Sequence, residues 1–542
     1  MLPSRIHASL VILVCISAGA FAESGATAAK PQDQDGALSP ALIDELRTGF
    51  RFDAETRVRH NAVTNASIND LSLNRSIVAG EDGHFSHRIK TKGVTNQKAS
   101  GRCWMFAGLN TMRPKVIDAK KLDSFEFSTA YLQFWDKMEK SNLFLEYMIE
   151  MRDTDYLDRE WELVHKWTLG DGGWWNFVVD LIEKYGVVPK SVMPETKSSE
   201  NTNEMNIVLE RMLNAHAVKL HAMHKGGKSV AELRDFKKKA LAEVYRFLVI
   251  NLGEPPREFE WRYVAPTPGD KDGESGKEKV ASTGNSAAPA VVVVKTGDAS
   301  SLKPFEVRPA DATDDAAVLP TPSKVAPASS AVKGLTPLRK YTPREFYKEY
   351  VGVALRDYVC LYNDPTNAYR SHLRFSRARN MAGSPDMDFV NLESDALKSI
   401  ASASVIANEP VWFAADVGKD QSSALGLMAD RLYDYGPLFG VDVAMTKADR
   451  IRFRAEASNH AMVFMGVDVR ENKPVKWLVE NSWGDQKGQK GTWTLYDAWF
   501  TEHVFVIIVN RKYVPVDVLK IFDEPAKVLP AWYPGAMGIE GK

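Results

Sequence analysis

The sequence predicts an α+β protein, with a helical first part followed by a β-rich second part. Apolar residues recur at helical spacing after Gly101 and again, over a longer stretch, between about residues 199 and 252. Towards the other end of the chain, residues 461–469 and 475–479 form short, nearly continuous apolar runs of the kind that become buried strands. A hydrophobic content of 44% in 542 residues is sufficient to fill a large core between these elements.

The N-terminal residues have the pattern of a cleaved export signal. Arg5 and His7 precede an apolar run over residues 8–16, and an Ala-x-Ala sequence predicts cleavage after Ala22. The run is too short to span a bilayer comfortably, which favours a signal peptide at 1–22 over the alternative of an uncleaved anchor. We therefore expect a secreted or periplasmic protein without a stable membrane anchor.

Changes in composition divide the rest of the chain into further segments. A polar stretch at 23–38 predicts a disordered linker, and residues 265–335, rich in Pro, Gly, Ser, Ala, Lys and Asp, predict a disordered insert or a partner-binding segment. The remaining boundaries are a helical part at 39–264, a β-rich part at 336–527 and a terminal segment at 528–542.

Neither the overall charge nor the histidine spacing indicates a nucleic-acid, membrane or metal partner, although a total charge does not exclude a local basic groove. A net charge of −1 gives no general attraction to nucleic acid or to an anionic membrane. His216, His221 and His224 are close in sequence, but their spacing does not bring all three to one helix face, so a solvated surface is favoured over a metal site. We expect no metal and no other cofactor.

Four residues together have the chemistry of a thiol protease. Cys103 supplies a nucleophile that attacks a carbonyl well only as a thiolate, and His460 can take its proton and return it to a leaving amine. The side-chain oxygen of Asn481 can hold the imidazole in the productive tautomer. Gln97 can donate an amide N–H to the oxyanion, together with the backbone N–H of Cys103.

The local pattern around each of these residues predicts how they come together. Cys103 falls at the start of the helical pattern, where the helix dipole favours a thiolate, and Pro114 predicts that this helix ends near Arg113. The apolar runs that flank residues 470–474 predict a hairpin, which would bring His460 and Asn481 together at its open end.

Each residue also has a simpler reading on its own. A single cysteine is more often a small buried hydrophobe, and a single histidine at a strand start is more often structural than catalytic. Trp104 after the cysteine and Trp483 after the asparagine favour the catalytic reading of the set. After removal of the signal peptide the only other cysteine is Cys360, and a disulfide to it would abolish the nucleophile.

These motifs resemble the bleomycin hydrolase/aminopeptidase C branch of the papain-like cysteine peptidases. The cysteine lies in Ser-Gly-Arg-Cys-Trp, not in the general papain pattern, and His460 lies much further downstream than the usual distance of about 130–150 residues. Both departures are typical of this branch, which carries large insertions. Further matching stretches are 125–128, 131–137, 171–174, 184–189, 410–419, 432–435 and 529–534.

The resemblance implies a papain-like two-part fold with helical insertions and an aminopeptidase acting on peptides. It assigns substrate contacts to Gly172, Gly173, Trp174 and Trp483, and it implies that residues 528–542 are an arm entering the active-site cleft. In that arrangement the carboxylate of Lys542 pairs with the α-amino group of the substrate. A homohexamer is also implied.

Two alternatives remain at the level of the sequence. The last residues of the arm differ from the family pattern, so the cleft of a cysteine endopeptidase could be open instead. The chain could also be a non-catalytic oligomeric scaffold that keeps the fold, although the presence of all four catalytic residue types argues against this.

Overall fold

The computed structural model describes residues 36–265 and 335–536. These described residues divide into two compact units, one that ends at Leu71 and one that begins at Ser72. The first contains α1 (Pro40–Gly49), α2 (Ala54–Asn65) and most of α3 (Ile68–Ser72). The predicted signal peptide, most of the predicted linker and insert, and residues 537–542 of the arm lie outside the described residues. Within the described part, no helix is long and apolar enough to cross a membrane.

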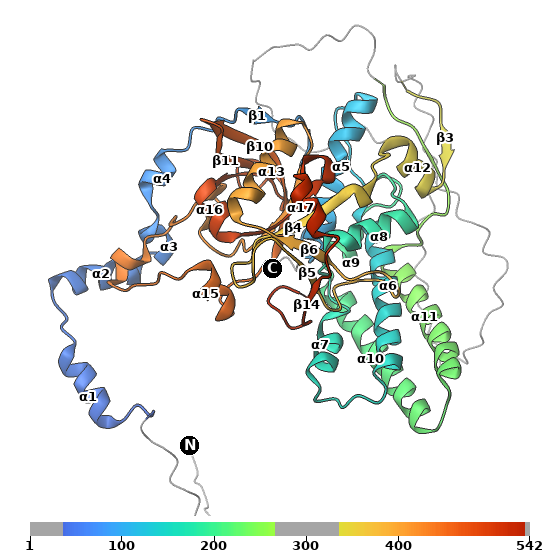
Figure 1. Ribbon diagram of the computed structural model, residues 1–542, viewed down its shortest axis with the longest axis horizontal. Coiled ribbons are helices and arrows are strands. Elements are labelled where there is room, and N and C mark those ends of the chain that lie inside the picture. Colours follow the sequence, from blue (N-terminus) through green and yellow to red (C-terminus); the bar gives the residue numbers. More distant parts are fainter. Residues whose placement is uncertain (1–35, 266–334, 537–542) are drawn as a thin grey trace, which may run out of the picture. The chain divides into compact units, whose positions relative to one another are not determined.

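Helices dominate the earlier part of the second unit (Figure 1). α6 packs against α8, α10 and α11, and buried leucines of α10, including Leu209, Leu213 and Leu220, recur on one helix face. The helices of this part are α4 (Arg75–Ala79), α5 (Cys103–Lys120), α6 (Thr129–Glu150), α7 (Arg159–Trp167), α8 (Trp175–Tyr185), α9 (Lys197–Glu200), α10 (Asn203–Lys225) and α11 (Val230–Leu252).

A mixed twelve-stranded sheet forms most of the later part of the chain, within the described residues. Its strand order is β14-β5-β6-β4-β13-β7-β10-β11-β12-β9-β8, and β1 pairs with β10. The strands are β1 (His87–Arg88), β4 (Tyr358–Tyr362), β5 (Ser371–Phe375), β6 (Asp388–Asn391), β7 (Val411–Ala415), β8 (Gln421–Ser422), β9 (Leu427–Met428), β10 (His460–Arg470), β11 (Lys473–Glu480), β12 (Thr492–Tyr496), β13 (Val504–Asn510) and β14 (Lys527–Leu529). The predicted α+β class is confirmed.

Shorter helices accompany this sheet. α13 packs against β10, β13 and β11, and α16 packs against β11 and β12. The helices of this part are α12 (Pro343–Tyr350), α13 (Ser394–Ile406), α14 (Tyr435–Phe439), α15 (Lys447–Arg452), α16 (Asp497–His503) and α17 (Val516–Ile521), with one-turn 3-10 helices at Leu355–Asp357 and Arg511–Tyr513.

The helix α5 joins the helical part to the sheet. Successive residues of a strand point to opposite faces, and in β7 Trp412 donates to the backbone oxygen of Trp104 at 3.1 Å while Phe413 stacks on Phe464. On its other side α5 lies against α8, where a Cβ added at Gly108 would be 2.8 Å from a methyl carbon of Val178. Glycine is required there because the two helices approach so closely.

The predicted end of α5 near Arg113 is wrong. The helix continues through Pro114 to Lys120. Proline cannot donate a hydrogen bond to the carbonyl of Asn110, but Val116 and Ile117 beyond it are buried in the core. The apolar burial of this last part of the helix outweighs the missing hydrogen bond.

A separate two-stranded sheet lies at the borders of the predicted insert. β2 (Phe259–Trp261) and β3 (Arg339–Tyr341) pair antiparallel, and Val264 forms a bridge with Leu335 further along. Trp261 packs edge-on against Phe346 of α12. The last described residues before the gap and the first ones after it are therefore paired with each other.

Candidate active site

Cys103 is the first residue of α5, as the sequence predicts, and none of its surface is exposed. The preceding residue, Arg102, has non-helical backbone angles, and its side chain does not cap the helix. The N-terminus of a helix carries a partial positive charge, which favours a thiolate over a thiol at this position.

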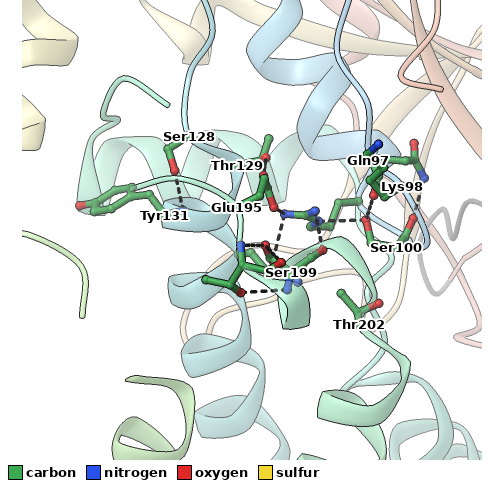
Figure 2. A network of polar contacts seen from close by, with 12 residues as sticks. Gln97, Lys98, Ser100, Ser128, Thr129, Tyr131, Glu195, Ser199 and Thr202 are labelled. Carbon is green, nitrogen blue, oxygen red and sulfur yellow. Dashed lines mark hydrogen bonds and ion pairs between the residues drawn. The ribbon is translucent and has the colours of Figure 1, made fainter. Parts of the chain in front are cut away.

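Arg102 fixes the loop before the nucleophile to the helical part. Its guanidinium is buried and donates to Ser100 Oγ at 3.0 Å, Gln133 Oε1 at 3.0 Å and the Ser199 carbonyl at 2.6 Å. It also forms an ion pair with Glu195 at 3.0 Å. Figure 2 shows this network, in which Glu195 lies beside Thr129 and the contacts reach Ser100 and Gln97. The loop is therefore held by charged and neutral contacts on both sides of the guanidinium.

Gln97 is oriented by both ends of its side-chain amide. The Nε2 group donates to the Ser100 carbonyl at 2.6 Å, and Oε1 accepts from Ser482 Oγ at 2.6 Å. An amide nitrogen carries two hydrogens, so one N–H remains for an oxyanion. The orientation leaves Gln97 suited to the role of oxyanion donor.

His460 and Asn481 meet at the open end of the β10–β11 hairpin, as predicted. His460 opens β10, β11 ends at Glu480, and the imidazole Nε2 donates to Asn481 Oδ1 at 2.7 Å. The same oxygen accepts the backbone N–H of Ser482 at 2.7 Å. Because Nε2 carries the proton, Nδ1 of a neutral ring has its lone pair available, and it has no hydrogen-bond partner among the described residues.

Burial controls the charge of the imidazole. His460 is 1% exposed, and this burial lowers its pKa to about 4, although the hydrogen bond to Asn481 acts in the opposite direction. The indole of Trp483 covers the ring, with the ring centres 4.8 Å apart. A neutral imidazole at neutral pH is the form that can accept a proton from a thiol.

Two buried contacts connect the segments that carry these residues. Gln97 donates its backbone N–H to the Ser482 carbonyl at 2.8 Å, which joins the loop of the nucleophile to the segment of Asn481. Arg113 of α5 forms a buried ion pair with Glu480 at 2.7 Å. The base, its orienting asparagine, the oxyanion donor and the helix of Cys103 are thereby held in one arrangement.

A cleft of about 910 Å³ opens beside His460 and Trp483. Its walls come from α7, from the loop after β7, from the loop before β10 and from the arm, of which residues 531–535 line the cleft. Tyr533 of the arm bonds to Asp364 and donates to or accepts from Thr366 Oγ1 at 2.7 Å. The arm is therefore attached to the sheet side of the cleft.

The residues predicted to bind substrate lie in different surroundings. Trp483 lines the cleft, whereas Gly172, Gly173 and Trp174 are buried and do not line it. A Cβ at Gly173 would be 2.5 Å from the Trp104 ring, so packing alone requires glycine there. Trp174 donates to the Ala536 carbonyl of the arm at 3.2 Å. Lys542 lies outside the described residues, and the substrate-binding roles stay predictions.

Sequence reasoning missed three residues of this site. Arg102 and Ser482 sit directly beside Cys103 and Asn481, so adjacency in the sequence was the signal that could have identified them. Asp416 lines the cleft within a stretch that matches the family, but nothing in its own neighbourhood marks it as special. Among the described residues no disulfide joins Cys103 to Cys360, and no group of three His, Cys, Asp or Glu side chains is placed to hold a metal.

A helical part and a mixed sheet that hold a cysteine at a helix start, a histidine–asparagine pair and a glutamine define a papain-like cysteine peptidase. The model of the Peptidase C1-like family matches residues 37–282 and 333–538, and the chain belongs to this family.

Named relatives are similar over nearly their whole length. The chain is 34% identical to aminopeptidase C of Streptococcus thermophilus, covering 92% of this chain and 98% of the relative. It is 32% identical to the bleomycin hydrolase of Homo sapiens, covering 91% of this chain and 96% of that relative. Among solved structures, PepW from Lactobacillus rhamnosis superposes with a TM-score of 0.77 at 33% identity, covering 92% of this chain and 98% of PepW.

Proposed function

We propose that this chain is an exported cysteine aminopeptidase, which removes N-terminal residues from peptides through a thioester acyl-enzyme. The observation that carries the proposal is the buried His460–Asn481 pair, whose orientation leaves imidazole Nδ1 available as a base. The names of the relatives, aminopeptidase C and bleomycin hydrolase, support the same class of reaction.

The reaction would begin with transfer of the Cys103 proton to His460. The thiolate attacks the scissile carbonyl, forming a carbon–sulfur bond, and the electron pair moves onto the carbonyl oxygen. The second N–H of Gln97 Nε2 and the backbone N–H of Cys103 stabilise this oxyanion. The oxyanion then collapses, the carbon–nitrogen bond breaks, and His460 gives its proton to the departing amine. A thioester between Cys103 and the N-terminal part of the substrate remains.

Water completes the cycle. His460, now neutral, takes a proton from a water molecule as its oxygen attacks the thioester carbonyl. A second oxyanion forms at the same donors and collapses with cleavage of the carbon–sulfur bond. The sulfur leaves as a thiolate and takes its proton back from the imidazolium, which restores the thiol and the neutral imidazole, and the N-terminal residue leaves as a carboxylic acid.

Restriction to N-terminal residues is supported by the arm. Residues 531–535 line the same cleft as His460. Arg454 donates to the Trp532 carbonyl at 3.0 Å, and Trp174 holds Ala536. An occupied cleft leaves less room for a long extended substrate on one side of the scissile bond. The alternative is endopeptidase action, which requires that the arm leaves the cleft open.

Substitution of Cys103→Ala tests the chemistry. We expect peptide hydrolysis to fall by several orders of magnitude because no other group replaces the nucleophile. Cys360→Ala is the matched control and should keep full activity, since that thiol lies on β4, which β13 and β7 separate from the strand of His460. Undiminished hydrolysis by the Cys103→Ala variant would end the proposal. Equal rates on free-amine and N-acetylated peptides would favour the endopeptidase.

Export and assembly are separate parts of the proposal. Export is supported by the leader pattern, and N-terminal sequencing of the mature protein should begin at Glu23. The homohexamer rests on the family resemblance, and light scattering of the purified protein should give the mass of six chains. An unprocessed N-terminus found in the cytoplasm, or a monomer mass, would contradict the respective part.

A further inference from the structure

Asp416 is a buried carboxylate in the cleft with only one of its oxygens used. It follows β7 directly, is 5% exposed and lines the same cleft as His460. Its Oδ1 accepts the backbone N–H of Gly418 at 2.9 Å and Nδ2 of Asn459 at 2.6 Å. Oδ2 accepts no hydrogen bond from the described residues. Unlike the unpartnered polar atoms of the core, it keeps some contact with solvent. This oxygen therefore remains open to the cleft.

No cation of the described chain compensates this carboxylate. Among the described residues, no Lys, Arg or His nitrogen lies within 4.0 Å of a carboxylate oxygen of Asp416, the limit for an ion pair. Lys419, in the same cleft, attracts the carboxylate more weakly from further away. Burial of an unpaired carboxylate is unfavourable. Two other buried carboxylates of the chain do have cationic partners: Asp171 pairs with Lys137, and Glu456 pairs with Arg450 and His503.

The hydrogen bonds of Asp416 do not explain its charge. An asparagine at this position could accept from both Gly418 and Asn459 through its single amide oxygen, without the cost of a buried anion. Burial, reinforced by the nearby Glu456, raises the pKa of Asp416, which is the response of a carboxyl that lacks a positive partner. A cation supplied from outside the chain would remove this cost.

The position of Asp416 beside His460 indicates that such a cation would belong to the substrate. Asn459, which Asp416 holds, precedes His460 and donates its backbone N–H to the Ala415 carbonyl at 3.0 Å. His460 is also the register partner of Ala415. A peptide whose scissile bond lies at His460 would therefore have its groups next to that bond within the part of the cleft that contains Asp416.

We propose that the Asp416 carboxylate binds an ammonium group of the substrate. The inference rests on the proposed peptidase function and extends it to the recognition of a charged group. Two parts of a peptide carry this chemistry: the free α-amino group at the N-terminus, and a lysine side chain beside the scissile bond. Binding of the first would contribute directly to aminopeptidase selectivity, independently of the terminal carboxylate of the arm.

The test compares Asp416→Asn with wild type on two matched pairs of peptides. One pair differs in a free or an N-acetylated N-terminus, and the other carries lysine or norleucine next to the scissile bond. We expect the variant to lose about 10- to 100-fold in kcat/KM on the ammonium member of one pair, the range of a charge-assisted hydrogen bond. The loss should appear mainly in KM, and the neutral member should be unaffected.

A second carboxylate of the cleft provides the control. Glu162 of α7 also lines the cleft but is exposed, so Glu162→Gln should change kcat/KM on each peptide by less than about threefold. A uniform fall on all four peptides in Asp416→Asn would overturn the proposal, because it would mean that Asp416 only positions Asn459 and His460. Unchanged kinetics on all four would overturn it as well.

A binding measurement separates this proposal from the peptidase assignment. In the Cys103→Ala protein, calorimetry with n-butylammonium and with 1-butanol reports recognition of the charge without any turnover. Tighter binding of the ammonium, lost on adding Asp416→Asn, would support the site even if no peptide were hydrolysed. Equal affinity of the Cys103→Ala protein for the two probes would overturn the proposed ammonium site. This comparison needs no Asp416→Asn variant, so it holds even if that variant does not fold.

Discussion

The two sides of the active site treat their buried aspartates in opposite ways. On the helical side, Asp171 receives Lys137 Nζ at 2.7 Å, Thr202 Oγ1 at 2.5 Å and the Gly101 N–H at 3.1 Å, and these partners hold its pKa far below the usual range despite burial. On the sheet side, burial raises the pKa of Asp416, which forms no ion pair with the described residues. The first carboxylate stabilises the fold, and the second is available for a ligand.

Removal of the cation on the helical side should have the largest effect. Lys137→Met would leave Asp171 as an uncompensated buried charge, and we expect a loss of about 3–5 kcal/mol in the free energy of unfolding, measured by urea denaturation. Lys190→Met, at an ion pair with Glu126 whose lysine is 48% exposed, is the control and should cost less than about 1 kcal/mol. Similar losses in both variants would contradict the difference drawn between the two sides.

Neutralisation of the carboxylate on the sheet side should have a small effect of opposite sign. Asp416→Asn should leave stability at pH 7 unchanged or raise it by up to about 1 kcal/mol, because it removes an unpaired buried anion. The pKa of Asp416 is raised in the folded protein, so the folded state favours the protonated carboxyl. The contribution of this carboxyl to the free energy of unfolding is fully present below the ordinary pKa of 3.8 and is lost as the pH rises through the folded pKa.

The advantage of the Asn variant over wild type should therefore shrink between pH 7 and pH 4, as followed by urea denaturation at both values. Asp171 provides the contrast. With its pKa lowered, its stabilising contribution is present above 3.8 and is lost only as the pH falls through the folded pKa. An Asn variant at Asp416 that is strongly destabilised at pH 7 would show that its charge is compensated after all.

The pKa of the His460 imidazole, which lies between these two sides, provides the prediction with the smallest expected effect. In Cys103→Ala, where no thiolate can stabilise the imidazolium, NMR of the His460 ring should show protonation near the pKa of about 4 that burial sets. In wild type a thiolate at Cys103 should raise that pKa if it forms an ion pair with the imidazolium. Titration near the ordinary 6.5 in the Cys103→Ala protein would mean that the ring is in contact with water and that the site is more open than its burial indicates.

Local sequence patterns predict the parts of this site that depend on short-range geometry. Cys103 starts a helix and His460 meets Asn481 because helix starts and hairpin ends are fixed by neighbouring residues. The predicted stop at Pro114 fails because distant packing partners hold the helix beyond it.

Contacts between distant segments could not be predicted in this way. Arg102 reaches Ser199, and Ser482 reaches Gln97 across 385 positions of the sequence. Asp416 forms no ion pair with the described residues, and no local pattern of residues in the sequence reveals that a carboxylate will be buried without one.

The pairing of β2 with β3 gives the molecule a tolerant point of insertion. Whatever sequence connects Val264 to Leu335 must leave and return at one place, since Phe259 pairs with Tyr341 and Trp261 with Arg339. We therefore expect a longer, shorter or different connection between these paired residues to leave the positions of the catalytic groups unchanged, so that a foreign sequence could be inserted there without loss of activity.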